Sequence, residues 1–148
     1  MSTPTSAIAV GSTATRSFGP ITRQMLVRYA GASGDFNPMH YDDEFARGAG
    51  FPSVFSQGMH QAGLLGTFAS EWLGPANVRR FHVRFREQVW PGDKLTCTGR
   101  VVEIRPSDEG PLAVVELTCD REGGGTAISG TATYLAPGAE VGTGEPDA

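Results

Sequence analysis

The segment from about Gln57 to Leu73 constrains the fold more than any other part of the chain. Apolar and small residues occur on every side of the helix that it would form: Met59, Ala62, Gly63, Leu64, Leu65, Gly66, Phe68, Ala69, Trp72 and Leu73. A helix without a polar face is stable in water only when other elements enclose it on most sides. The sequence therefore predicts a central, buried helix.

The residues after this helix have the pattern of a β-sheet. Within 80–89, Phe81, Val83 and Phe85 alternate with arginines and a histidine, which predicts a strand with one buried and one wet face. Further strands are expected over 94–104, 112–120 and 126–135, with turn signals between them. Residues 16–19 could form a short first strand.

Two shorter helices are expected before the central one. Residues 20–33 have helical spacing with Thr22 as a plausible N-cap, and residues 41–50 can form a short helix that Asp42 or Asp43 begins. The whole order predicts an α+β fold, in which consecutive antiparallel strands form a curved sheet around the buried helix. A dimer that joins two such sheets edge to edge is one way to protect their edges.

The composition fits one domain, because 148 residues are enough for a single substantial core. We expect this domain over 14–136, with flexible segments at 1–13 and 137–148, which are small, polar and aperiodic. A net charge of −4 gives no field that would hold nucleic acid or an anionic membrane. The first residues lack the pattern of a signal peptide, so a cytoplasmic protein is expected.

Two cysteines, Cys97 and Cys119, lie in strand-like runs without CxxC spacing. Isolated cysteines of this kind are typically reduced and buried, so we predict that both are small core residues.

The stretch GASGDFNPMH, residues 31–40, carries the first candidate chemistry. A calcium loop would begin with the spacing of Asp35 and Asn37, but its next ligand falls on Met39 and its glycine on His40, so no metal is expected. Two interpretations remain open. The residues could form a capped turn, or Pro38 could enforce an extended step that lets Asp35 and His40 converge as an acid/base pair on water.

A second candidate is Gly58, which begins the central helix in the stretch FSQGMH. Exposed amides at a helix N-terminus can hold a developing oxyanion, and glycine lets a substrate carbonyl approach closely. A glycine needed only for packing explains the same position equally well.

The stretch YAGASGDFNPMHYDDEFA closely resembles the hydratase 2 motif of the MaoC-like dehydratases, also called R-specific enoyl-CoA hydratases. The lead-in TRQMLVRYAGASGD, the helix start QGM and the run VRF…VWPGD also resemble the short members of that family, over roughly residues 14–135. The resemblance implies a single hotdog fold, in which a curved antiparallel sheet wraps a long helix.

The resemblance also implies roles for individual residues. Asp35 and His40 would be the catalytic pair, which adds water to a trans-2-enoyl thioester or removes it from a (3R)-3-hydroxyacyl thioester. Asn37 would order the loop or the water, and the Gly58 amide would bind the thioester oxygen. The residues that flank this glycine, Gln57 and Met59, are expected to line the same site.

The same resemblance implies no cofactor, a coenzyme A or acyl carrier protein thioester as substrate, and a homodimer or a heterodimer with a second hotdog chain. Many relatives have histidine where this chain has Gln57, and some have serine near the position of Gly66, so pocket shape is expected to differ. A non-catalytic partner subunit and a thioesterase are the alternatives, and the intact Asp35 and His40 count against the first.

Other residues have structural and functional interpretations. His60 could line the pocket or be a satisfied structural histidine, and His82 is expected on the wet face of its strand. The arginines Arg79, Arg80, Arg84 and Arg86 either bind phosphate or an acidic carrier, or form a solvated sheet face.

Overall fold

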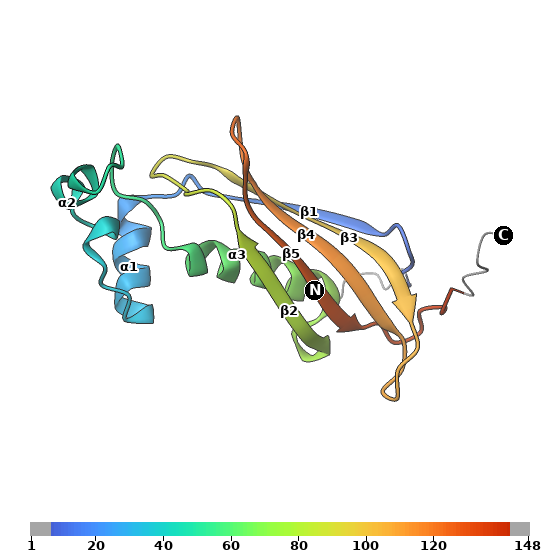
Figure 1. Cartoon of the computed structure of the whole chain (residues 1–148). Helices are drawn as coiled ribbons and strands as arrows, with labels where there is room; N and C mark the ends of the chain where they lie inside the picture. The colour runs from blue at the N-terminus through green and yellow to red at the C-terminus, as the bar shows by residue number, and fades with distance from the viewer. Residues whose placement is uncertain (1–6, 143–148) are drawn as a thin grey trace.

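The computed structural model describes residues 7–142, and its centre is one sheet with one long helix lying across it (Figure 1). Five strands pair in the order β1-β3-β4-β5-β2, and every pair is antiparallel. The strands are β1 (Thr13–Phe18), β2 (Val78–Phe85), β3 (Leu95–Arg105), β4 (Leu112–Arg121) and β5 (Thr126–Leu135). The helix α3 (Gly58–Leu73) lies along one face of the sheet, which confirms the predicted α+β architecture.

The predicted pairing of four consecutive strands is wrong in one respect. Strands β3, β4 and β5 form a meander, but β2 pairs with β5 and not with the next strand in sequence. The free side of β3 is occupied by β1, from Thr13 opposite Arg100 to Phe18 opposite Leu95. Strand β2 is therefore left at the edge of the sheet, and β1 forms the opposite edge.

The core lies between the sheet and α3, as the alternating patterns predict. The inward residues of β4 are almost fully buried, and they are Ala113, Val115, Leu117 and Cys119. From the helix, Leu65, Phe68 and Ala69 pack against them. At Gly99 on β3 a Cβ atom would lie 2.7 Å from the Trp72 ring, so this close approach of helix and sheet requires glycine.

Within residues 7–142, α3 is enclosed on most sides but not on all. Met59, Gly63, Thr67 and Glu71 follow one another at helical spacing and are exposed. We call these four residues the open stripe of α3. The all-round apolar pattern of the sequence thus leaves one narrow side of the central helix uncovered in the single chain.

The smaller helices form where their capping residues predict. Helix α1 (Arg23–Ser33) begins after Thr22, whose hydroxyl accepts from the Met25 amide at 3.2 Å, and ends at Gly34 in the left-handed conformation. Helix α2 (Asp43–Gly48) begins after Asp42, whose carboxylate accepts from the Phe45 amide at 3.1 Å. Two short 3₁₀ helices, η1 (Pro38–His40) and η2 (Pro75–Asn77), complete the elements.

The two cysteines are free and buried, as predicted, and they face each other across β3 and β4. The pKa of the Cys97 thiol is raised because it hydrogen-bonds to Cys119 and because it is buried. Within residues 7–142, no helix has the length and apolar character needed to cross a membrane.

The expected flexible ends lie partly outside the described residues, since 1–6 and 143–148 are not described. Of the remaining N-terminal residues, Gly11 donates its amide to the carbonyl of Val101 at 2.8 Å. The domain limits of 14 and 136 stay a prediction.

Candidate active site

Residues 34–57, which we call the α1–α3 segment, carry the candidate catalytic pair. This segment includes η1 and α2, and together with α1 it lies beyond the end of the sheet (Figure 1). Asp43 at the start of α2 fixes the segment internally, because its carboxylate accepts from the Val54 amide at 3.0 Å and pairs with Arg23 of α1 at 3.0 Å. These two partners hold the pKa of Asp43 below its ordinary value.

Side chains order the turn that leads to His40. The Asp35 carboxylate accepts a hydrogen bond from the backbone N–H of Asn37 at 3.3 Å. The side-chain oxygen of Asn37 accepts one from the backbone N–H of Met39 at 3.1 Å. These Asx-type contacts are the capped turn that the sequence suggested. The turn then runs directly into η1, which ends at His40. The capped turn and the convergence of Asp35 with His40 therefore coexist.

The imidazole of His40 is held in one orientation. Its side chain is only 8% exposed, and its Nδ1 lies 2.7 Å from the carbonyl oxygen of Phe55, which can only accept a hydrogen bond. The Phe55 ring also packs edge-on against the imidazole, with 5.3 Å between ring centroids. Nδ1 therefore carries the proton in the neutral ring, and Nε2 is left as an acceptor.

Asp35 and His40 meet without bonding directly. The Asp35 Oδ2 lies 3.5 Å from His40 Nε2, and the carboxylate is half-exposed while the imidazole is buried. Both atoms are acceptors in this state, so neither can satisfy the other. One water molecule can donate a hydrogen bond to each of them, and such a water would be oriented and activated as a nucleophile.

Gly58 lies at the N-terminus of α3, as expected. The residue before it, Gln57, forms no side-chain cap, so the first amides of the helix are available to an external acceptor. A Cβ atom at Gly58 would lie 3.0 Å from the ring of Phe85. Both interpretations of this glycine therefore have structural support, because its amide has no partner among residues 7–142 and its missing side chain makes room for Phe85.

A cavity of about 310 Å³ borders Gly58. Its lining residues come from the start of α3, the end of β2 and the residues beside them, and they are Phe55, Ser56, Gly58, Gln61, Phe85, Arg86, Glu87, Gln88 and Ile128. Asp35 and His40 lie outside this lining. Phe55 links the Asp35–His40 pair to the cavity, because its carbonyl oxygen accepts from His40 and the residue also lines the cavity.

The two neighbours of Gly58 lie differently from each other. Gln57 is 1% exposed, and its side-chain amide donates to the Leu26 carbonyl at 3.1 Å, which ties the start of α3 to α1. Met59 is 60% exposed and belongs to the open stripe. Neither residue lines the cavity beside Gly58, and their expected part in substrate binding stays a prediction.

The arginines in β2, together with Arg86 directly after it, divide into two groups. Arg79 forms an ion pair with Glu109 at 2.8 Å, and Arg86 donates to the Ser129 hydroxyl at 3.1 Å. Arg80 and Arg84 alternate with His82, opposite Thr133, Ser129 and Thr131 of β5, and all three are exposed. We call Arg80, His82 and Arg84 the outward row of β2.

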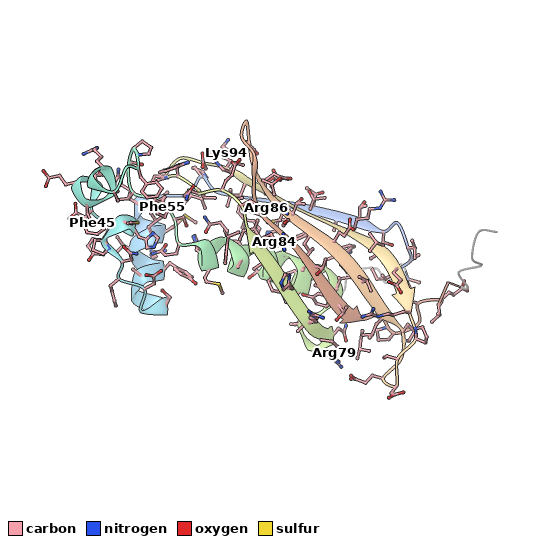
Figure 2. The ribbon with its side chains drawn as sticks, viewed as in Figure 1. Phe45, Phe55, Arg79, Arg84, Arg86 and Lys94 are labelled. Atoms are coloured by element: carbon pink, nitrogen blue, oxygen red, sulfur yellow. The ribbon has the colours of Figure 1, made fainter. Side chains whose placement is uncertain are left out.

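Figure 2 shows how the labelled side chains lie along the molecule. Phe45 and Phe55 lie in the α1–α3 segment. Arg84, near the end of β2, and Arg86, directly after it, lie nearer to this segment, and Arg79 lies at the far end of the strand. Phe85, which the alternation pattern predicts to be buried, is 53% exposed, because it lies at the last position of β2 beside the first turn of α3.

Sequence reasoning missed two residues of the cavity, Ser56 and Gln61. Both are almost fully buried, and the Ser56 hydroxyl donates to Gln61 Oε1 at 3.2 Å. It also lies 3.0 Å from Nδ1 of His60, whose pKa is lowered by burial. Polar residues at the start of an otherwise apolar helix were the available signal.

Comparison with known proteins gives one family. The model of the MaoC like domain matches residues 9–121. The (R)-specific enoyl-CoA hydratase of Aeromonas caviae is 28% identical over 114 residues, which cover 76% of this chain and 84% of that protein. A mitochondrial 3-hydroxyacyl-[acyl-carrier-protein] dehydratase of Solanum lycopersicum is 28% identical over 112 residues, or 76% and 68% of the two chains. These relatives are hydratases and dehydratases, which makes them hydro-lyases.

Solved structures agree with the fold. The (R)-hydratase from A. caviae superposes with a TM-score of 0.78 at 26% identity, over 89% of this chain and 99% of that one. The ChsH1-ChsH2 complex from Mycobacterium tuberculosis gives a TM-score of 0.75 at 20% identity, over 86% and 97%. The truncated HadBC (3R-hydroxyacyl-ACP dehydratase) complex, also from M. tuberculosis, gives 0.69 at 15% identity, over 84% and 95%. Similar hotdog chains thus occur in complexes of two different chains.

Proposed function

Since the chain belongs to the MaoC-like domain family, we propose that it is an (R)-specific enoyl-thioester hydratase, or in the reverse direction a (3R)-3-hydroxyacyl-thioester dehydratase. The observation that supports this best is the pair of acceptors, Asp35 Oδ2 and His40 Nε2, which lie 3.5 Å apart at one point. A hydratase needs such a pair, because it must orient a water molecule, take a proton from it and return a proton to carbon.

The proposed hydration begins with this water. Its oxygen attacks C3 of a trans-2-enoyl thioester while one of its protons passes to the Asp35–His40 pair. The electrons of the C2=C3 bond move toward C1, and the thioester oxygen takes up the negative charge of an enolate. The pair then returns a proton to C2, so the net reaction adds H and OH across the double bond. Delivery of both from one side makes the addition syn.

The amide of Gly58 would stabilise the enolate oxygen. Amides at the start of a helix point along its axis and carry partial positive charge, so they favour a developing anion. The cavity beside this glycine offers the space in which the thioester would lie. Asn37 has a supporting part in this proposal, since its bond to Met39 N shapes the turn that carries both catalytic side chains.

The proposed assembly contains a second hotdog chain, either a copy of this one or a different one. Two surfaces support this. The open stripe of α3 leaves Met59 60% exposed on an otherwise enclosed helix, and β2 is an unpaired edge of eight residues. The carrier of the acyl group would be coenzyme A or acyl carrier protein, and the proposed location is the cytoplasm.

The direct test is hydration of crotonyl-CoA and of longer trans-2-enoyl-CoA thioesters by the purified protein, followed as loss of enoyl absorbance. The product should be the (3R)-3-hydroxyacyl thioester, which chiral chromatography identifies. Release of free thiol without hydration would contradict the proposal and favour a thioesterase. Absence of turnover with every chain length, for the chain alone and with a partner chain, would also contradict it.

A further inference from the structure

Three polar side chains at the start of α3 form a connected chain of hydrogen bonds. Ser56 is 3% exposed and Gln61 is 2% exposed, and the serine hydroxyl donates to the glutamine Oε1 at 3.2 Å. The same hydroxyl oxygen lies 3.0 Å from Nδ1 of His60. Burying such groups is costly unless they are paired, so their orientation is well determined by one another.

The hydroxyl fixes the direction of this chain. A serine hydroxyl has one proton, and Ser56 donates it in the hydrogen bond to Gln61. His60 Nδ1 must therefore donate to the serine oxygen. Burial lowers the pKa of His60, which keeps the ring neutral, with one proton for this bond. Every donor in the chain therefore points the same way, from His60 through Ser56 to Gln61.

The last group in the chain is the side-chain NH₂ of Gln61. Its oxygen is occupied by Ser56, and no acceptor for its Nε2 is found among residues 7–142. Within that range, Gln57 Oε1 is the one fully enclosed side-chain polar atom without a partner. The Gln61 NH₂ is therefore not fully enclosed by protein, and Gln61 lines the cavity beside Gly58.

We propose that Gln61 is a catalytic residue, whose Nε2 donates a hydrogen bond to the thioester oxygen beside the Gly58 amide. Gly58 and Gln61 are one helical turn apart, and helical side chains lean toward the N-terminus of their helix, which brings this NH₂ toward the Gly58 amide. The Ser56 and His60 side chains are positioning residues, because they prevent the amide of Gln61 from turning over. This inference rests on the proposed hydratase function.

Two donors suit the chemistry better than one. When water attacks C3, a full negative charge develops on the thioester oxygen, and this oxygen can accept more than one hydrogen bond. A donor held in place before the reaction needs no reorganisation when the charge appears. The chain from His60 also polarises the Gln61 amide, which strengthens its last bond.

The test replaces Gln61 with leucine, which has similar volume and cannot donate. Loss of one such donor lowers kcat by about a hundredfold or more, and we expect this loss with little change in KM. Gln61→Met, a second side chain of similar size that cannot donate, should lose as much. Gln24→Leu removes an exposed glutamine of α1 and serves as the matched control, with kcat expected to be unchanged.

A spectroscopic measurement keeps the test independent of turnover. Hydrogen bonds to the thioester oxygen of bound 2,4-hexadienoyl-CoA shift its absorption to longer wavelength. Both proteins carry Asp35→Asn, so that this 2-enoyl thioester is not hydrated; we expect the shift with Gln61 intact and a smaller one with Gln61→Leu, on samples whose circular dichroism matches. Ser56→Ala should fall between the two.

The outcomes separate the two proposals. If the wild type hydrates enoyl-CoA while Gln61→Leu keeps its kcat and its spectral shift, the role of Gln61 is refuted and the hydratase function stands. Full activity of Gln61→Met would also refute the inference, because this side chain cannot donate. If the wild type hydrates no thioester, the proposed function fails, and the inference fails with it.

Discussion

Replacement of Asp35 by asparagine tests the shared-water geometry most directly, because the structure specifies how the new side chain will lie. In the wild type, Oδ1 accepts from the Asn37 amide at 3.3 Å and Oδ2 lies 3.5 Å from His40 Nε2. In the variant, the side-chain oxygen at position 35 will keep its hydrogen bond from the backbone N–H of Asn37. Its NH₂ group will then face Nε2 of His40 and donate to it.

Replacing the carboxylate oxygen by an NH₂ group removes both acceptors of the water, Asp35 Oδ2 and His40 Nε2. The carboxylate oxygen that would hold the water is gone, and the lone pair of the His40 Nε2 is occupied by the new NH₂ group. Loss of a general acid or base costs about 10² to 10⁴ in rate. We expect kcat to fall by at least about a thousandfold, which corresponds to roughly 4 kcal/mol of lost transition-state stabilisation. Because Asp35 is half-exposed, the melting temperature should hardly change.

The assay is the initial rate of crotonyl-CoA hydration, measured beside circular dichroism and thermal melting. Asp108→Asn is the matched control, since it removes the same charge from an exposed position in the turn between β3 and β4. It should retain full activity. If Asp35→Asn keeps more than a tenth of the wild-type kcat, the two-acceptor mechanism is refuted.

Three further predictions concern other parts of the molecule. His40→Ala should abolish hydration and also lower the free energy of unfolding by about 1–3 kcal/mol, because the Phe55 carbonyl loses its partner; urea denaturation measures this. Gly99→Ala should destabilise the fold by about 1–3 kcal/mol, since its methyl group would lie 2.7 Å from the Trp72 ring, and thermal melting would detect this. The lowered pKa of Asp43 contributes stability above its ordinary pKa that is lost as the pH falls through the folded value. Asp43→Asn should therefore flatten the acid limb of a stability-against-pH curve.

The sequence predicted the elements of the fold better than their arrangement. The caps Thr22 and Asp42 begin helices as expected, because capping depends on local contacts. Alternation in β2 identifies which face is buried, but it says nothing about which strand lies beside it, and the pairing of β2 with β5 therefore could not be read from the pattern. Phe85 escapes burial for a similar reason, since its exposure depends on where α3 begins and not on its own strand.

The candidate site was predictable where its residues are close in sequence. Asp35 and His40 are five positions apart, so one turn can bring them together, and their motif carried the family resemblance. The Phe55 carbonyl that orients the imidazole could not be predicted, because backbone groups leave no trace in the sequence. Ser56 and Gln61 were missed because their contact exists only once the start of α3 has formed.

The charge of the outward row of β2 affects which strand can pair with this edge of the sheet, a second copy of β2 or a strand of a different chain. If two copies joined antiparallel about a two-fold axis, residues on the same face would meet, so arginine would lie opposite arginine in three of the five registers that overlap the row on itself. Like charges directly opposite each other destabilise a strand pair. A different chain with acidic side chains at these positions would replace each repulsion by an attraction. In those registers the alternating strand disfavours pairing with its own copy at this edge, and an acidic strand would pair with it more stably.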